Sequence, residues 1–189
     1  MVAMGFTQVE GVDYNETFAS VMVTKSFRIL LAIWNLRAEH EMEHWDIKQA
    51  FINAPLDEVI YCRPVQGFEK RPGEILKLRK ALYGTKQAAH AWQKFLKKNL
   101  LALGAKVHPK DDCVFIFRDD RGGWLFLSTH VDDLFPSGKH LRDRVYEALG
   151  RVVEVEDRGL LSWALSTKIE RDAQRGCSKF HRKRTLCRS

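Results

Sequence analysis

Two apolar runs joined by an acidic, glycine-rich link constrain the fold of this chain more than any other stretch. Residues 113–131 read CVFIFRDDRGGWLFLSTHV, and the Asp and Gly residues of the link favour the backbone angles of a tight turn. The segment therefore predicts a β-hairpin. Its second strand runs directly into Asp132 and Asp133, whose adjacent carboxylates repel each other unless solvent or a partner stabilises them. These aspartates are either a solvated turn or part of a functional site.

Hydrophobic periodicity elsewhere in the chain predicts a mixed α+β fold. Apolar residues at helical spacing predict helices over 26–40, 86–104 and 140–150. Gly104 is typical of a helix C-terminus. Short or alternating apolar runs predict further strands over 41–51, 59–65, 74–84, 152–156 and 162–170. We expect an antiparallel sheet with helices packed on one face.

The composition is that of a soluble globular protein, with 45% hydrophobic and 29% charged residues among 189. The longest apolar helix-like stretch, residues 27–36, is too short to cross a bilayer. Residues 1–18 lack the basic and apolar regions of a signal peptide. No C-x-x-C pair occurs among the cysteines, which are Cys62, Cys113, Cys177 and Cys187. We expect a reduced intracellular protein, cytoplasmic or nuclear and not secreted, with no membrane partner.

The net charge of +7 is concentrated at the C-terminal end. Eight basic and two acidic residues lie between Lys168 and Ser189, so that segment carries +6. The basic balance is therefore no evidence that the folded body binds nucleic acid. We expect residues 1–172 to form the folded domain and residues 173–189 a basic tail, which is either disordered and solvated or a phosphate-binding arm.

A third aspartate, Asp46, lies near the end of a predicted strand, as Asp132 follows another. In the strand of Asp46, His44 shares its face, and Trp45 and Ile47 lie on the other face. If the two strands are neighbours, their carboxylates converge at one edge of the sheet. Such a site suits Mg²⁺, and the charge of the ion offsets the repulsion between carboxylates. Two ions about 4 Å apart serve polymerases, nucleases and phosphatases alike, so spacing alone leaves these classes open.

Several motifs occur in a fixed order over about residues 2–172. They are GFTQVEGVDYNETFASV, WDIKQAFINAPLDEVIYCRPVQGF, LKLRKALYGTKQAAHAW, DDCVFIFR, HVDDL and IERD. In sequence and order they resemble the reverse transcriptase domain of Ty1/copia-type retrotransposons. The resemblance implies an RNA-directed DNA polymerase with a right-hand palm and partial fingers, and with the thumb absent.

The same resemblance implies that Asp46, Asp132 and Asp133 are the catalytic carboxylates. Asp46 and Asp132 would bridge two Mg²⁺ ions, with Mn²⁺ as an alternative, Asp133 would complete the site, and Ile47 would offer its backbone carbonyl to a metal. The ions would activate the primer 3′-hydroxyl, orient the dNTP and stabilise the leaving pyrophosphate. The implied partners are an RNA or DNA template with its primer, dNTPs, and remaining polyprotein regions such as integrase and RNase H.

Nucleotide binding is implied for Ile47, Phe51, Tyr83, Gly84 and Gln87. Phe51 would pack under the incoming sugar and select deoxynucleotides, although a core aromatic fits its position equally well. Tyr83 and Gly84 would line the nucleotide and template pocket. For Gln87 the alternative is the ordinary polarity of a helix N-terminus.

Some positions depart from the family pattern. His130 and Val131 match primer-contacting positions, but the residue before V-D-D is usually Tyr and here is His130. Pro136 interrupts the strand expected after the aspartates, and proline is tolerated mainly at a sheet edge. These departures keep a second function open, that of a catalytically inactive truncated relic that at most binds nucleic acid non-specifically. A third is a two-metal nuclease or phosphatase, for which His44 is the nearest candidate base.

Overall fold

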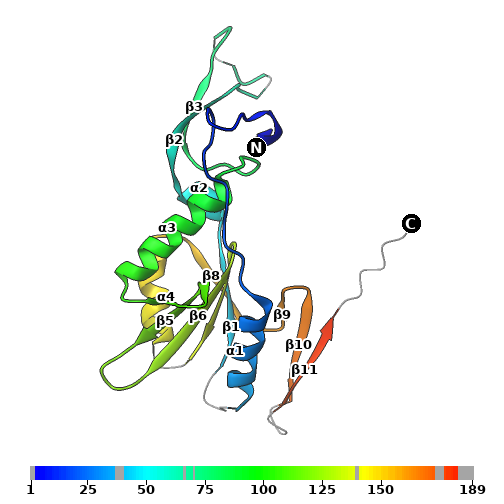
Figure 1. Cartoon of the computed structure of the whole chain (residues 1–189), viewed down its shortest axis with the longest axis vertical. Coiled ribbons are helices and arrows are strands. Elements are labelled where there is room, and N and C mark those ends of the chain that lie inside the picture. Colours follow the sequence, from blue (N-terminus) through cyan, green and yellow to red (C-terminus); the bar gives the residue numbers. More distant parts are fainter. Residues whose placement is uncertain are drawn as a thin grey trace, which may run out of the picture.

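A computed structural model of the chain describes residues 3–36, 41–65, 67–69, 71–138, 141–172 and 177–182 (Figure 1). The helices are α1 (Thr24–Leu36), α2 (Ala50–Asn53), α3 (Ala88–Ala102) and α4 (Arg142–Gly150), with a 3-10 turn, η1, at Gly5–Thr7. The strands are β1 (Glu43–Ile47), β2 (Pro55–Cys62), β3 (Leu76–Lys80), β4 (Lys106–His108), β5 (Asp111–Arg118), β6 (Trp124–His130), β7 (Asp133–Ser137), β8 (Val155–Leu160), β9 (Trp163–Ala164), β10 (Thr167–Asp172) and β11 (Cys177–Arg182).

The largest sheet is six-stranded and antiparallel, in the order β4-β5-β6-β7-β1-β8. A two-stranded ribbon, β2-β3, and a three-stranded sheet, β11-β10-β9, complete the described strands. The ribbon projects away from the main sheet beside the N-terminal segment, as Figure 1 shows. The sequence expectation of an α+β fold with antiparallel sheets is confirmed.

The predicted hairpin forms between β5 and β6. Phe117 pairs with Leu125, and Arg118 with Trp124. In the connecting turn the side chain of Asp119 accepts hydrogen bonds from the backbone N–H groups of Arg121 (2.9 Å) and Gly123 (2.6 Å). The hairpin prediction is confirmed, and β7 then folds back on β6 as a second hairpin, so the two aspartates lie at the β6–β7 turn.

Helices cover both faces of the main sheet, which corrects the expectation of helices on one face only. Against one face, α3 and α4 bury a cluster that includes Trp92, Leu149 and Trp45. Against the other face, α1 buries a second cluster that includes Trp34 and Phe135. Periodicity identifies amphipathic helices, but it carries no information on which side of a sheet each one docks.

Helix α3 follows its predicted pattern closely. Its buried side chains include Trp92, Leu96 and Leu100, which recur every four residues along one stripe. The helix ends before Gly104, whose φ of +93° is the left-handed conformation that terminates many helices. The backbone N–H of Ala105 returns to the carbonyl of Leu100 at 3.1 Å. The predicted close of this helix at Gly104 is therefore confirmed.

The strand predicted over 41–51 ends early. Strand β1 stops at Ile47 because Gln49 adopts φ +52° and α2 begins at Ala50. The side chain of Asn53 stabilises this reversal by donating to the carbonyl oxygens of Lys48 (3.1 Å) and Gln49 (3.2 Å). The alternating pattern of β1 itself is as expected, because Trp45 and Ile47 are buried while His44 and Asp46 are half-buried.

Pro136 lies inside β7, between β6 and β1, and not at a sheet edge. It pairs with Leu127 of β6. Towards β1 the ladder holds at Leu134 and Asp133, lapses beside Pro136, and resumes only as a single bridge between Met42 and Ser137. A missing backbone donor is thus tolerated in an interior strand because the ladder breaks locally on one side.

The C-terminal region differs from expectation in two respects. The run predicted as one strand over 162–170 is two strands, β9 and β10, separated by Leu165 and Ser166 in left-handed conformations. Strand β11 lies within the segment expected to be a disordered tail, and it pairs with β10. Residues 173–176 and 183–189 lie outside the described residues. Within the described part, no helix is long and apolar enough to span a membrane.

Candidate active site

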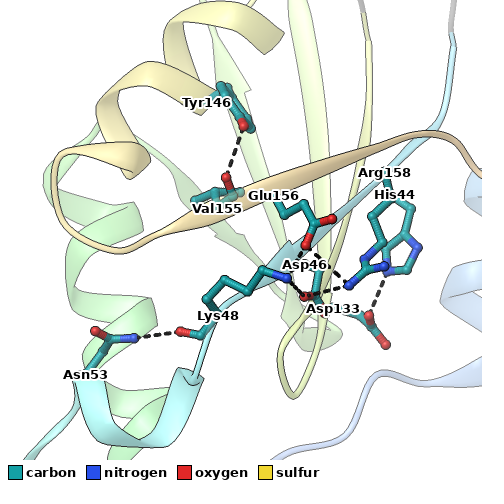
Figure 2. A network of polar contacts seen from close by, with 9 residues as sticks. All are labelled: His44, Asp46, Lys48, Asn53, Asp133, Tyr146, Val155, Glu156 and Arg158. Atoms are coloured by element: carbon teal, nitrogen blue, oxygen red, sulfur yellow. Dashed lines mark hydrogen bonds and ion pairs between the residues drawn. The ribbon is translucent and has the colours of Figure 1, made fainter.

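Strand pairing brings the three predicted catalytic aspartates to one end of the main sheet, where Figure 2 shows Asp46 and Asp133. Asp46 of β1 stands directly opposite Asp133, the first residue of β7. Asp132 precedes it in the turn, and its backbone carbonyl accepts a hydrogen bond from the N–H of Ile47 at 2.9 Å. The strand that Asp132 follows, β6, is therefore not the neighbour of β1 as expected, because β7 lies between them. The aspartates still converge, since β7 begins at Asp133 and pairs with β1.

The turn that presents Asp132 is held from α3. Val131 has φ +58°, a conformation that β-branched residues rarely adopt. The indole N–H of Trp92 donates to the carbonyl of Val131 at 2.6 Å. His130 precedes the turn, and its Nδ1 is buried with no hydrogen-bond partner among the described residues. A buried helix residue thus fixes the backbone from which Asp132 projects.

Asp46 is engaged by two basic side chains. The guanidinium of Arg158, on β8, donates to Oδ2 of Asp46 at 3.1 Å, and Nζ of Lys48 lies 3.9 Å from the same oxygen. Both cations also contact Glu156, the residue of β8 that pairs with Asp46. The hydrogen bond and charge of Asp46 raise the pKa of Arg158, and the hydrogen bond from Lys48 lowers the pKa of Glu156. Figure 2 shows these four side chains together on one face.

Asp133 has a different partner, His44. Nε2 of His44 lies 2.6 Å from Oδ1 of Asp133. The ring of His44 also lies against Phe135, with centroids 5.4 Å apart. His44 therefore stands between the apolar cluster under α1 and the carboxylates.

Burial and neighbouring acidic groups dominate the electrostatics of Asp132, and the charge of His130 acts in the opposite direction. Burial raises the pKa of Asp132, and the negative charges of Asp133 and Asp46 raise it further. The three carboxylates are thus close enough to repel one another. A bound cation relieves that repulsion.

The donor set fits divalent magnesium in chemistry. Carboxylate oxygens and a backbone carbonyl are the hard ligands that Mg²⁺ and Mn²⁺ accept. Among the described residues, however, no three acidic, histidine or cysteine side chains are grouped as a preformed metal site. Asp46 and Asp133 instead turn towards Arg158 and His44, so ion binding would require these two carboxylates to reorient.

The predicted nucleotide-binding residues fall into two groups. The ring centroids of Phe51 and Tyr83 lie 4.5 Å apart. Burial raises the pKa of Tyr83, and the charges of Asp132 and Asp46 add to that effect. These two aromatic residues therefore belong to the same neighbourhood as the aspartates.

Gly84 and Gln87 instead pack against the N-terminal segment. A Cβ added at Gly5 would lie 2.0 Å from the carbonyl oxygen of Gly84, so the two backbones are in close contact. Gln87 is 2% exposed, and its amide contacts the side chain of Gln8 and the carbonyl of Asp13. Both ends of that amide are used inside the protein, which favours a structural role.

Sequence reasoning missed Lys48, Glu156 and Arg158. Lys48 follows Asp46 by two positions, and Glu156 and Arg158 alternate along one face of β8, which is a detectable signal. Their convergence depends on the pairing of β8 with β1, between strands more than a hundred positions apart. That pairing could not be read from local patterns.

Comparison with known proteins places the chain in a family. A family model described as reverse transcriptase (RNA-dependent DNA polymerase) matches residues 1–179. The Retrovirus-related Pol polyprotein from transposon RE1 of Arabidopsis thaliana is 31% identical over 180 residues, which cover 90% of this chain and 12% of that protein. The Retrovirus-related Pol polyprotein from transposon TNT 1-94 of Nicotiana tabacum is 30% identical over 176 residues, which cover 91% of this chain and 13% of that protein.

A shorter relative is a putative transposon Ty5-1 protein of Saccharomyces cerevisiae, 30% identical over 133 residues, which cover 68% of this chain and 42% of that protein. This chain therefore spans only a small part of the length of the Pol polyproteins it matches. Among solved structures there is no match to the chain. The match to the family model extends over nearly the whole chain, and the chain belongs to the reverse transcriptase family of RNA-directed DNA polymerases, with relatives among Ty1/copia-type Pol polyproteins.

Proposed function

We propose that this chain carries the polymerase site of a Ty1/copia-type reverse transcriptase, with the main sheet as the palm and the β2-β3 ribbon as part of the fingers. The observation that carries the proposal is the direct pairing of Asp46 with Asp133, with Asp132 in the adjoining turn, in a chain of this family. The reaction joins a nucleotide to a primer. The primer 3′-oxygen attacks the α-phosphorus of a dNTP, pyrophosphate leaves, and the hydroxyl proton passes to solvent.

Asp46 and Asp132 would hold two Mg²⁺ ions, with the carbonyl of Ile47 as a further ligand and Asp133 completing the site. When bound, the ions supply activation of the attacking oxygen and charge stabilisation of the leaving pyrophosphate. The N–H of Ile47 already donates to the carbonyl of Asp132, so β1 and the turn would move as one unit. That coupling would keep the two principal carboxylates in fixed relation during the reaction.

Phe51 and Tyr83 would form the apolar wall for the incoming nucleotide. Their ring contact, beside Asp132 and Asp46, supports this role. A 2′-hydroxyl would clash with a bulky ring under the sugar, so Phe51 would favour deoxynucleotides. His130 and Val131 would meet the primer end, because they directly precede Asp132 in the strained turn.

Primer extension on poly(rA)/oligo(dT) with Mg²⁺ or Mn²⁺ tests the proposal. The full chain is compared with D132N and, as a matched control, with D120N in the exposed β5–β6 turn. We expect incorporation by the wild type and D120N and none by D132N. Incorporation that survives D132N would overturn the assignment.

The relic function has one observation in its favour, because Asp46 and Asp133 are already engaged by Arg158 and His44. It predicts no incorporation by the wild type, together with salt-sensitive, sequence-independent binding of nucleic acid that D132N leaves unchanged. Filter binding of the same template-primer over a salt series distinguishes it from the polymerase proposal.

A further inference from the structure

Arg158 contacts the carboxylate of Asp46, which the proposed function assigns to a divalent cation. β8 pairs with β1 so that Glu156 stands opposite Asp46, and Arg158 follows two positions later on the same face. From there its guanidinium reaches back to Oδ2 of Asp46 at 3.1 Å. Lys48 approaches the same oxygen at 3.9 Å. One carboxylate oxygen is therefore shared by two protein cations.

This arrangement sets up a direct competition. An oxygen that accepts from a guanidinium has less lone-pair density to offer a metal, and two positive charges within about 5 Å repel an incoming dication. Arginine stays protonated at every working pH, so the competition does not depend on pH. The carboxylate of Asp46 is 21% exposed, so water screens these charges only in part.

We propose that Arg158 is a positioning residue that sets the divalent-cation affinity of the carboxylate site by competing for Asp46. The inference rests on the proposed function, since it takes Asp46 as a metal ligand. Glu156 is the alternative partner for Arg158 when an ion binds Asp46, because it lies 3.4 Å from the guanidinium of Arg158 and also contacts Lys48. Arg158 is 45% exposed, so it can leave Asp46 without burying an unpaired charge.

Mn²⁺ binding to the full chain, followed by electron paramagnetic resonance of the free ion and by calorimetry at low salt, tests the proposal. We expect R158Q to bind Mn²⁺ about tenfold more tightly than the wild type, because Oδ2 of Asp46 is then released from the charge-assisted hydrogen bond of the guanidinium and is available to the ion. The matched control is R121Q, which removes the same charge from the exposed turn at the opposite end of β6 and should change the affinity less than about twofold.

A double-substituted chain separates a contact with Asp46 from a general charge effect. If Arg158 acts through Asp46, adding R158Q to D46N should change Mn²⁺ affinity no more than R121Q does. A tenfold gain that persists in the D46N background would overturn the proposal. An affinity of R158Q equal to that of the wild type or of R121Q would overturn it as well.

R158K guards against misfolding of R158Q. It keeps the charge with a shorter side chain that lacks the guanidinium fork, and we expect an affinity between those of the wild type and R158Q. Wild-type binding of Mn²⁺ that D46N abolishes but Arg158 substitutions leave unchanged would sink this inference alone. Absence of Mn²⁺ binding in the wild type and in every variant would sink the metal site of the proposed function together with it.

Discussion

The two faces of β1 have opposite characters. On one face Trp45 and Ile47 are almost fully buried under α3 and α4. On the other, His44 and Asp46 are half-buried and engage other polar side chains. A single five-residue strand thus anchors the core with alternate side chains and presents the carboxylate site with the others. The precision of the polar face depends on the packing of the apolar face, because one backbone carries both.

Even the apolar face has a charge, and that charge is compensated. Glu43 is 6% exposed, and burial raises its pKa. Arg142 of α4 forms an ion pair with it, and the indole of Trp45 donates to it at 3.2 Å. Charges on both faces have protein partners, but Glu43 is almost fully buried, whereas Asp46 and Asp133 retain partial access to solvent. The comparison teaches that exposure, rather than charge alone, separates the structural acid from the candidate catalytic acids.

The largest expected effect lies on the site side of this comparison. D132N should reduce primer extension by about a thousandfold or more, because a loss of transition-state stabilisation near 4 kcal/mol has that effect on rate. Folding should survive, as circular dichroism would check. If D132N unfolds the chain, the distinction between the two faces is wrong, because Asp132 would then be required for folding.

The next largest effect lies on the core face. W45A should lower the free energy of unfolding by about 3–5 kcal/mol, because it removes a large buried ring and leaves a cavity. The neighbouring substitution H44A, on the site face, should lower it by about 1 kcal/mol. Urea denaturation of both variants measures the difference. Equal losses of unfolding free energy in W45A and H44A would show that the two faces of β1 contribute equally to stability, contrary to this comparison.

A smaller effect is expected where the core meets the site. W92F keeps most of the buried ring but removes the donor to the carbonyl of Val131. We expect a stability loss of about 1–2 kcal/mol and a fall in primer extension greater than that stability loss explains. The control is F95Y, which changes another aromatic ring of α3 that is partly buried. It leaves the hydrogen bond from Trp92 to Val131 intact. A fully folded W92F variant with a normal rate of primer extension would show that the hydrogen bond from Trp92 does not affect the site.

The smallest effect is a pH dependence of stability. The pKa of Asp132 is raised in the folded chain, so the folded state holds that proton more tightly than the unfolded state does. The ionised carboxylate therefore opposes folding at neutral pH, and this opposition disappears as pH falls through the raised pKa towards the ordinary aspartate value. D132N should melt at a higher temperature than the wild type at pH 7, with the gap closing near pH 4. A gap that widens on acidification would contradict a raised pKa for Asp132 in the folded chain.

The sequence was informative where structure is local. The β5–β6 hairpin, the close of α3 near Gly104 and the alternation in β1 follow from turn chemistry and short-range periodicity. The three aspartates were found because strand ends and a family resemblance point to the same positions. Their partners were not found, since Arg158 reaches Asp46 only through the pairing of distant strands. The position of Pro136 in an interior strand was not expected either, because it depends on where the pairing of β7 with the distant strand β1 is interrupted.

The left-handed conformation of Val131 affects which substitutions would be favoured by selection for thermal stability. A β-branched residue in that conformation costs about 1–3 kcal/mol of backbone strain, whereas glycine would adopt it freely. A variant chosen for thermal robustness alone would therefore be expected to lose the valine. The same change would make the backbone that carries Asp132 more flexible. Higher thermal stability and a fixed position of Asp132 are therefore opposing requirements at Val131. A substitution in this turn that stabilises the protein is therefore expected to weaken the proposed function of the carboxylate site.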